Sequence, residues 1–291
     1  MSGSAHIFRY PGGKSKKSVA SRILGAFPKE FDEIRIPFVG GGGIFFHLYP
    51  GDSTVWINDI NPHLIEVYKV LKERPEDFIS KCREIEPDKG DEPLVPAKNG
   101  KALYNARLKT LFDKFKGDEE MDQALRYFFI NRTVWGGRVI YGDESRLYFS
   151  NPRGWNVIKG GQLKNAARCV SSAKITCGDY LPLLEASGSN VLIYCDPPYV
   201  SDTEASEKSR LYASGFTIED HERLAYEVKR CQHKVCLSYD EDEKGMIRSL
   251  YPESEGFEVT STEWKYVGSS RNKKVYGKEL IITNYSSEEL F

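Results

Sequence analysis

A series of short apolar runs is the feature that most limits what this chain can fold into. The runs are rich in Val, Ile, Leu, Phe and Tyr, and they are nearly continuous rather than alternating with polar residues. Strands buried on both faces have this pattern. The predicted strands span residues 33–39, 55–58, 174–177, 191–195, 234–238, 258–267 and 279–284. Because segments with helical spacing lie between them, we predict an α/β layer fold with a mainly parallel sheet.

Two helix starts can be identified directly. Asn61 is a suitable N-cap and Pro62 suits the first helical turn, with apolar residues following at spacings of three and four. Thr217 and Asp220 have the spacing of a capping box ahead of a second helix.

The strand–helix alternation breaks between about residues 75 and 170. Prolines and glycines mark residues 87–100 as irregular, and a helical segment is expected at residues 102–115. We therefore predict a sheet domain formed by residues 1–61 and 171–291, interrupted by an inserted, mostly helical subdomain at residues 62–170.

Composition excludes several classes of protein. The chain has 41 Lys and Arg against 42 Asp and Glu, so bulk positive charge does not hold it on nucleic acid. No apolar run approaches the roughly 20 residues that a membrane helix needs, and the first residues do not resemble a secretory signal. The six cysteines form no Cys-x-x-Cys pair, and there is no metal-binding His/Cys cluster. We expect a cytoplasmic protein with buried thiols, including Cys177 and Cys195, and without a metal site.

Positive charge is nevertheless concentrated in one region. Residues 126–174 contain nine Lys or Arg against Asp143 and Glu144, a local balance of +7, and aromatic residues lie among them. Basic groups can bind phosphates and aromatic rings can stack on bases, which is typical of a nucleic-acid surface. A solvated basic face over an aromatic core is an equally good interpretation of this pattern alone.

The tetrapeptide Asp196-Pro197-Pro198-Tyr199 is the strongest chemical signal. It follows an apolar run, at the carboxyl end of a predicted strand, where α/β sheets bind ligands. The two prolines stiffen the turn, so the Asp196 carboxylate and the Pro197 carbonyl are acceptors of restricted direction. Two such acceptors suit the two hydrogens of a planar exocyclic amine, and the ring of Tyr199 suits the base that carries it.

A glycine-rich turn follows the first predicted strand, at residues 40–43 after Phe38. It permits close approach of a ligand to the backbone, but the third glycine of the dinucleotide-binding pattern is replaced by Phe45. Asp59, at the end of the next strand, suits ribose hydroxyls, although a role at the start of a helix is an alternative. Lys14 lies on a glycine turn that is not a phosphate-binding loop, because Phe8 stands where that motif needs glycine.

Taken together, these motifs resemble those of the Dam-type, class-alpha adenine-N6 DNA methyltransferases. The order of the motifs also matches, and they span nearly the whole chain. They are Arg9-Tyr10-Pro11-Gly12-Gly13-Lys14, Pro37-Phe38-Val39-Gly40-Gly41-Gly42, Asn58-Asp59-Ile60-Asn61-Pro62, Phe129-Ile130-Asn131-Arg132, Gly178-Asp179, Asp196-Pro197-Pro198-Tyr199 and Glu279-Leu280-Ile281-Ile282-Thr283-Asn284-Tyr285.

The resemblance implies a Rossmann-like fold, S-adenosylmethionine as methyl donor and double-stranded DNA as partner. It places Tyr10, Lys14, Phe38, Gly40 and Gly42 at the cofactor, with the methionine end of the cofactor held by Lys14 and residues 38–42. Ile36 stands where the family commonly has Glu or Asp, so no residue is assigned to the cofactor's ammonium.

The resemblance also assigns the remaining roles. Asp59 would bind the ribose hydroxyls and Asp179 the cofactor's adenine edge, while Asp196 would lie at the cofactor and, with Pro197, Pro198 and Tyr199, hold a flipped adenine. Residues 62–170 would recognise the DNA target, with a hairpin at residues 127–155. The predicted DNA contacts are Asn131, Arg132, Trp135, Arg138 and Arg153.

The resulting hypothesis is base flipping followed by direct methyl transfer in a prokaryotic or phage-encoded enzyme. A cognate restriction endonuclease is a compatible second partner. The alternatives are methylation of cytosine N4 or of adenine in RNA, a DNA-binding module without activity, and a nicotinamide-dependent dehydrogenase.

Overall fold

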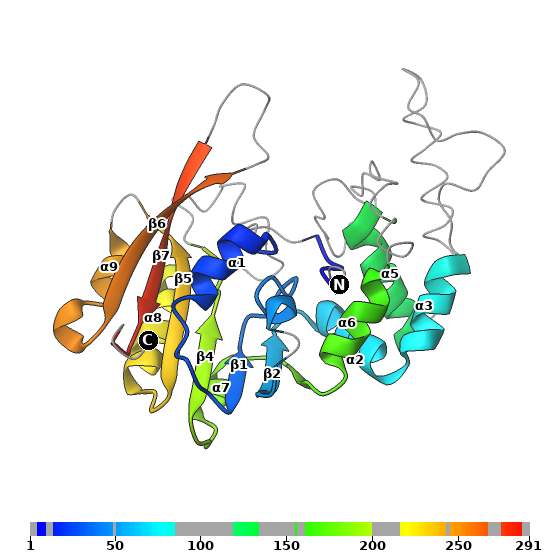
Figure 1. Ribbon diagram of the computed structural model, residues 1–291, viewed down its shortest axis with the longest axis horizontal. Coiled ribbons are helices and arrows are strands. Elements are labelled where there is room, and N and C mark those ends of the chain that lie inside the picture. The colour runs from blue at the N-terminus through cyan, green and yellow to red at the C-terminus, as the bar shows by residue number, and fades with distance from the viewer. Residues whose placement is uncertain are drawn as a thin grey trace. The chain divides into compact units, whose positions relative to one another are not determined.

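The computed structural model describes residues 5–9, 14–48, 51–84, 119–133, 155, 161–199, 216–242, 245–266 and 275–286 (Figure 1). The chain divides into two compact units. The helical unit comprises Met1–Pro11, Gly40–Gly42 and Asn61–Ile175, and the sheet unit comprises Gly12–Val39, Gly43–Ile60 and Thr176–Phe291. The predicted division into a sheet domain at residues 1–61 and 171–291 and a target-recognition subdomain at residues 62–170 stays a prediction.

A seven-stranded sheet has the strand order β3-β2-β1-β4-β5-β7-β6. Strands β1, β2, β4 and β5 are parallel, whereas β7 is antiparallel to both β5 and β6. The strands are β1 (Glu33–Ile36), β2 (Thr54–Asp59), β3 (Lys174–Cys177), β4 (Val191–Cys195), β5 (Lys234–Asp240), β6 (Glu258–Tyr266) and β7 (Val275–Thr283). The predicted mixed α/β fold with a mostly parallel sheet is confirmed, and every predicted run contains or overlaps a strand.

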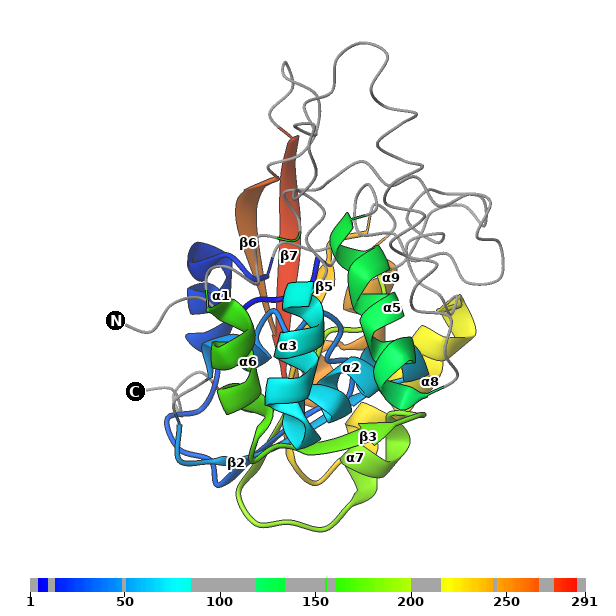
Figure 2. The same ribbon diagram turned by 90° about the vertical axis from the view of Figure 1, so that its right-hand side faces the viewer.

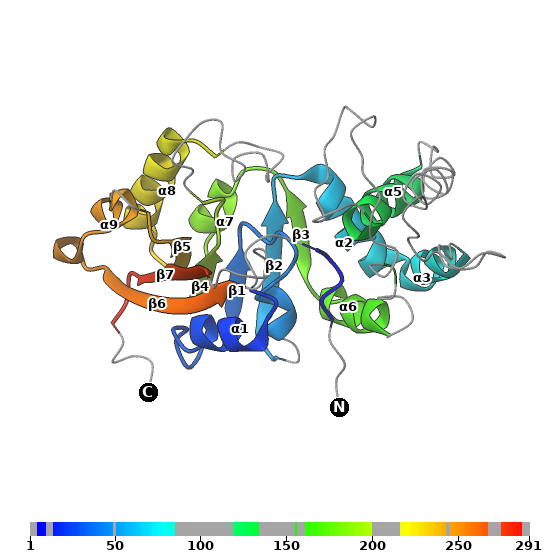
Figure 3. The same ribbon diagram turned by 90° about the horizontal axis from the view of Figure 1, so that it is seen from above.

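Helices cover both faces of the sheet (Figure 3). One face carries α7 (Leu181–Glu185), α8 (Ile218–Arg230) and α9 (Met246–Leu250), and α1 (Lys17–Leu24) lies on the other. The residues of β4 that point to the α8 face, Val191, Ile193 and Cys195, are fully buried against the helices. Among the described residues, this unit also contains short 3-10 helices at Phe45–His47 and Glu253–Glu255. The predicted capping box of Thr217 and Asp220 starts α8.

The helical unit is built around α2 (Pro62–Glu73), which contacts α3 (Pro75–Glu84), α5 (Glu120–Thr133) and α6 (Gln162–Val170) (Figure 2). Asn61 caps α2 as predicted, because its side chain accepts hydrogen bonds from the backbone of His63 and Leu64. Helix α5 is buried on most of its surface, and the rings of Phe128 and Phe129 both pack against Trp155.

The prediction of a hairpin starting at residue 127 is wrong over residues 127–133. These residues are the last turns of α5, where Tyr127 to Asn131 are buried. The rest of the predicted hairpin, residues 134–154, and the predicted helix at 102–115 lie outside the described residues.

Four of the six cysteines follow the expectation of buried thiols: Cys82, Cys169, Cys195 and Cys236. Cys231 is partly exposed, and Cys177 is exposed, although it ends an apolar run. The run could not show this, because it does not say which strand lies at the sheet edge, where β3 is found. Among the described residues, no helix has both the length and the apolar character needed to cross a membrane.

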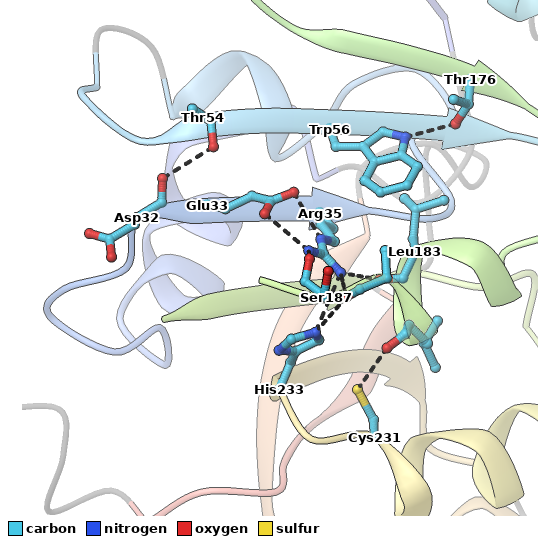
Figure 4. A network of polar contacts seen from close by, with 12 residues as sticks. Asp32, Glu33, Arg35, Thr54, Trp56, Thr176, Leu183, Ser187, Cys231 and His233 are labelled. Atoms are coloured by element: carbon cyan, nitrogen blue, oxygen red, sulfur yellow. Dashed lines mark hydrogen bonds and ion pairs between the residues drawn. The ribbon is translucent and has the colours of Figure 1, made fainter. Parts of the chain in front are cut away.

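A buried arginine joins β1 to the end of α7 (Figure 4). Arg35 is 1% exposed and pairs with Glu33 through Nε and Nη2, at 2.8 and 3.0 Å. It also donates to the carbonyls of Leu183, Ala186 and Ser187 at 2.6–3.0 Å. A guanidinium has enough donors to satisfy these acceptors, and its positive charge suits the carbonyl end of a helix.

We expect Arg35→Met to lower the free energy of unfolding by about 3–5 kcal/mol, because it leaves a partly buried carboxylate and several carbonyls without their donor. Urea unfolding followed by circular dichroism measures this change. Arg74→Met is the control, since Arg74 is 54% exposed and pairs with an exposed Asp77; its expected cost is below about 1 kcal/mol. Equal costs for the two variants would contradict the role of Arg35.

Candidate active site

The predicted chemical residues of the sheet unit lie at the carboxyl ends of neighbouring strands. Phe38 follows β1, Asp59 ends β2, Asp179 follows β3 and Asp196 follows β4. Parallel strands end at one edge of a sheet, and this is where α/β proteins bind ligands. The structure therefore brings residues that are up to 158 positions apart in sequence to one edge.

Lys14 links the Asp-Pro-Pro-Tyr turn to strand β7. Its Nζ contacts Asp196 Oδ1 and the Tyr199 hydroxyl, and lies 3.1 Å from Glu279 Oε1 and 4.5 Å from the centre of the Tyr199 ring. The Tyr199 hydroxyl donates to Glu279 Oε1 at 3.2 Å. We call Lys14, Asp196, Tyr199 and Glu279 the carboxylate cluster.

Asp196 is held by one of its two oxygens. Ser238 of β5 also donates to Oδ1, at 3.3 Å, and the Ser238 hydroxyl is itself hydrogen-bonded to Tyr194 at 2.8 Å. No hydrogen bond from another described residue reaches Oδ2, and the side chain is 27% exposed. The carboxylate is thus oriented by Oδ1 while Oδ2 is left available to a ligand.

Burial and charge set the ionisation of the cluster. Burial favours a neutral Lys14, but the attraction of Asp196 and Glu279 outweighs it and raises the pKa of Lys14. Burial raises the pKa of Asp196, and the contact with Lys14 limits the increase. Burial also raises the pKa of Glu279 to about 8, although Lys14 opposes this. Lys14 is therefore charged and shared between two carboxyl groups.

Gly43 packs directly against Lys14. A Cβ on residue 43 would lie 3.0 Å from Lys14 Cβ and 3.3 Å from its carbonyl carbon. Within the glycine-rich segment, Gly43 therefore permits the close approach that brings Lys14 to the cluster.

Asn58 ties together the turns at the sheet edge. Its amide donates to the carbonyls of Pro37 and Gly178, at 3.1 and 2.9 Å, and accepts from Thr176 Oγ1 at 2.8 Å. The carbonyl of Asp59 accepts from the backbone of Gly178 at 3.0 Å. The turns that follow β1 and β3 are consequently anchored to β2.

Asp179 presents an accessible carboxylate. It accepts from the backbone of Leu181 at 2.8 Å and from both Nη atoms of Arg223, at 2.8 and 3.2 Å. Partial burial would raise the pKa of Asp179, but these donors lower it below its usual value. Both partners are more than 40% exposed, so the ion pair is open to exchange with a ligand.

Phe38 lies in an aromatic group in the same unit. Its ring centre is 5.3 Å from that of Tyr180 and 5.9 Å from that of Phe216. Phe38 follows β1, Tyr180 follows β3 and Phe216 precedes α8. The three rings therefore lie beside the turn that carries Asp179. Flat apolar surfaces of this kind suit the face of a purine.

Gly40 and Gly42 belong to the helical unit and have positive φ angles of 48° and 72°. Residues with a Cβ rarely adopt this backbone conformation. The carbonyl of Gly40 accepts a hydrogen bond from the buried Tyr68 hydroxyl at 2.9 Å. The glycine turn is thus fixed by α2.

Asn131 and Arg132 form hydrogen bonds with the N-terminal segment, residues 5–9. The Asn131 amide accepts from Arg9 N and donates to Arg9 O, both at 2.8 Å, and Arg132 donates to the carbonyl of Ile7 at 3.1 Å. Asn131 is 1% exposed, and burial, with the nearby charge of Arg9, lowers the pKa of Arg132 to about 10. Contact of these two residues with DNA stays a prediction.

Four other predicted site residues lie outside the described residues: Tyr10, Trp135, Arg138 and Arg153. Conversely, sequence reasoning missed Glu279, Ser238 and Asn58 as parts of the site. The available signal for Glu279 was its position at the start of the apolar run 279–284, because a carboxylate is rarely buried in a strand without a partner.

The residues present fit S-adenosylmethionine. Carboxylates at the ends of β2, β3 and β4 match a ligand with ribose hydroxyls, an amino group and a positive charge. Glu279 Oε2 is buried and has no hydrogen-bond partner among the described residues, so ionisation of Glu279 is costly unless a cation lies nearby.

Comparison with known proteins agrees with this chemistry. A family model described as D12 class N6 adenine-specific DNA methyltransferase matches residues 10–267. The type II methyltransferase M.MjaIII of Methanocaldococcus jannaschii is 28% identical, covering 96% of this chain and 98% of its own length. The type II methyltransferase M1.LlaDCHI of Lactococcus lactis subsp. cremoris is 25% identical over 96% of this chain and 95% of its own length. The DNA adenine methylase of Haemophilus influenzae is 23% identical over 94% of this chain and 92% of its own length.

The family match spans most of the chain and includes the cluster residues Lys14, Asp196 and Tyr199. The chain therefore belongs to the D12 class of N6 adenine-specific DNA methyltransferases and is a site-specific adenine DNA methyltransferase.

Proposed function

We propose that the chain transfers a methyl group from S-adenosylmethionine to the N6 amine of an adenine rotated out of a specific duplex sequence. The observation that carries this proposal is the geometry of Asp196. Its Oδ1 is held by Lys14 and Ser238, and no donor among the described residues reaches Oδ2; we assign Oδ2 and the neighbouring Pro197 carbonyl to the two amine hydrogens.

The chain's own residues account for orientation and charge. Asp196 and Pro197 direct the amine lone pair out of the base plane by accepting its hydrogens, and Asp196 stabilises the positive charge that develops on nitrogen. The ring of Tyr199 offers a face on which the base can stack, worth roughly 1–3 kcal/mol against the cost of flipping. The bound cofactor supplies a methyl group that is already activated, so alignment provides much of the rate enhancement.

We assign Asp59 to the ribose hydroxyls of the cofactor and Asp179, with Phe38 and Tyr180, to its adenine. Lys14, Gly40 and Gly42 are proposed for the methionine end. The exposed carboxylate of Asp179 and the neighbouring rings support the adenine assignment, because an exocyclic amine donates to a carboxylate while its ring packs on aromatic faces.

Residues 62–170 are proposed to recognise the target sequence, with Trp135, Arg138 and Arg153 at the DNA. The net charge of +7 over residues 126–174 supports this assignment. Two relatives are named type II methyltransferases, and we extend the proposal to a restriction endonuclease that cleaves the same unmethylated sequence. The archaeal and bacterial relatives support a prokaryotic or phage-encoded enzyme acting in the cytoplasm.

The test is to incubate the protein with labelled S-adenosylmethionine and random-sequence duplex DNA, then to identify the modified nucleoside and map its positions. N6-methyladenine at one recurring sequence is the expected result. N4-methylcytosine, or label in RNA alone, would replace this proposal by one of the other amine substrates.

We expect Asp179→Ala to weaken the binding of S-adenosylmethionine about tenfold or more, because it removes a charged acceptor worth roughly 1.5–3 kcal/mol. Isothermal titration calorimetry measures the affinity. Asp77→Ala is the matched control, since this exposed carboxylate also pairs with an arginine but lies on α3. An unchanged affinity in Asp179→Ala would remove Asp179 from the cofactor site.

A further inference from the structure

Glu279 is a buried carboxyl group of the cluster to which the mechanism above gives no role. It lies on β7, and its side chain is 1% exposed. Oε1 is 3.1 Å from Lys14 Nζ and accepts from the Tyr199 hydroxyl at 3.2 Å, whereas Oε2 is buried and has no hydrogen-bond partner among the described residues. A carboxylate with one unsatisfied buried oxygen is costly unless that oxygen carries a proton.

Among the described residues, the groups around Glu279 carry more negative than positive charge. Lys14 is the positive group in contact with it, and Asp196 after β4 and Asp240 at the end of β5 oppose its ionisation. Tyr199 and the buried Tyr194 face the same cluster, and burial raises the pKa of both hydroxyls far above the neutral range. Together, burial and these charges raise the pKa of Glu279 to about 8, so the free protein holds a proton there at neutral pH.

A cation beside Asp196 would change this balance. The reacting amine is held by Asp196 in the proposed function, and it must touch the methyl carbon of the donor, whose positive charge is one bond further away. That positive charge would therefore lie near the cluster, and it favours ionised over protonated Glu279. The demethylated product carries no such charge.

We propose that Glu279 stores the proton exchanged during methyl transfer: it gives up its proton when the cationic donor binds and takes up the proton that the target amine loses. This inference rests on the proposed function. It makes Glu279 the final acceptor of the proton. Asp196 accepts the proton only in passing, because it must return to its ionised, Lys14-bound state after each turnover.

Protons and charge both balance over the methyl transfer. The amine nitrogen forms a bond to the methyl carbon with its lone pair, and the carbon–sulfur bond breaks with its electron pair left on sulfur. The surplus proton on nitrogen moves to the Asp196 carboxylate. The Asp196 carboxyl group then turns so that its protonated oxygen faces Lys14; Lys14, in contact with both carboxyl groups, donates a proton to Glu279 and regains the one carried by Asp196. The cluster gains one proton as the ligand loses one positive charge, so the total charge of the buried site is unchanged.

Calorimetry on the full-length protein tests this proposal without measuring turnover. Titrations in buffers of different ionisation enthalpy count the protons released on binding. At pH 7 we expect wild type to release about one proton more with S-adenosylmethionine than with S-adenosylhomocysteine, which lacks the sulfonium charge. The dissociation constant for S-adenosylmethionine should fall by up to about tenfold per pH unit between pH 6 and 8 and then level off.

The variant Glu279→Gln keeps the shape and the contact with Lys14 but cannot titrate. We expect it to bind both ligands with no difference in proton release and with a dissociation constant that no longer depends on pH in this range. Glu255→Gln, at an exposed position paired with Lys229, is the matched control and should behave like wild type. Unchanged affinity of Glu279→Gln for S-adenosylhomocysteine shows that its site is intact.

The outcomes separate the two proposals. Equal proton release by wild type with the two ligands, or a difference that persists in Glu279→Gln, overturns the role of Glu279 and leaves the proposed function standing. No binding of S-adenosylmethionine by wild type overturns both. If Glu279→Gln does not fold, equal proton release by wild type with the two ligands still overturns the role of Glu279.

Discussion

Replacing Asp196 by alanine is expected to reduce methyl transfer to DNA adenine about 1000-fold, a loss similar to that of removing a central electrostatic group from other active sites. The reason is that Asp196 both orients the target amine and carries the negative charge opposite the developing cation. Asp196→Asn should be equally damaging, because its amide NH₂ is a donor and would face either Lys14 or the target amine.

The measurement is single-turnover incorporation of labelled methyl groups into duplex DNA, followed by nucleoside analysis. Asp52→Asn, at an exposed position in the turn before β2, is the matched control and should retain wild-type activity. Wild-type rates in either Asp196 variant would exclude the mechanism, whatever the affinity for the cofactor.

Replacing Lys14 by methionine is expected to have the largest combined effect on activity and stability. Lys14 is 5% exposed; it pairs with the Asp196 carboxylate, and its Nζ lies 3.1 Å from Glu279 Oε1. Removing one partner from a buried ion pair leaves uncompensated charge and costs about 3–5 kcal/mol. Methyl transfer should be lost as well, because Asp196 would then bind a proton in place of the amine.

The stability loss should depend on pH with a definite sign. A carboxyl group whose pKa is raised on folding binds more protons in the native than in the unfolded state, so stability falls as pH rises from its unfolded value of about 4.5 through its folded value. For Glu279 in wild type this window ends near pH 8. Without Lys14, the pKa values of Glu279 and Asp196 both rise further, so the loss should be larger at pH 8 than at pH 5.5.

Urea unfolding at these two pH values measures the difference. Lys17→Met, on the exposed face of α1, is the control and should leave both activity and the pH dependence of stability unchanged. A Lys14→Met variant that is as stable as wild type at pH 8 would show that the two carboxyl groups do not depend on this lysine.

Local features of the fold were predictable because neighbouring residues determine them. The strands, the Asn61 cap and the Thr217 capping box follow from patterns that span a few residues. The prediction of a hairpin at residues 127–133 was wrong because a mixture of aromatic and basic residues was interpreted as a surface. The packing of these rings around α5 depends on α2 and Trp155, which lie far away in the sequence.

The sequence by itself determined the α/β class, the position of Asp196 at the end of a strand, and the family resemblance. Only the tertiary structure decided which charged groups meet. Lys14 could be interpreted from sequence as a surface turn or a cofactor contact, yet it lies against Asp196, 182 residues away, and against Glu279 on the antiparallel strand β7. Asn131, predicted to contact DNA, bonds the backbone of Arg9, 122 residues away. The physical reason is that the ionisation of a buried group depends on its nearest charges and its exposure to water, and both are set by the path of the whole chain rather than by neighbours in sequence.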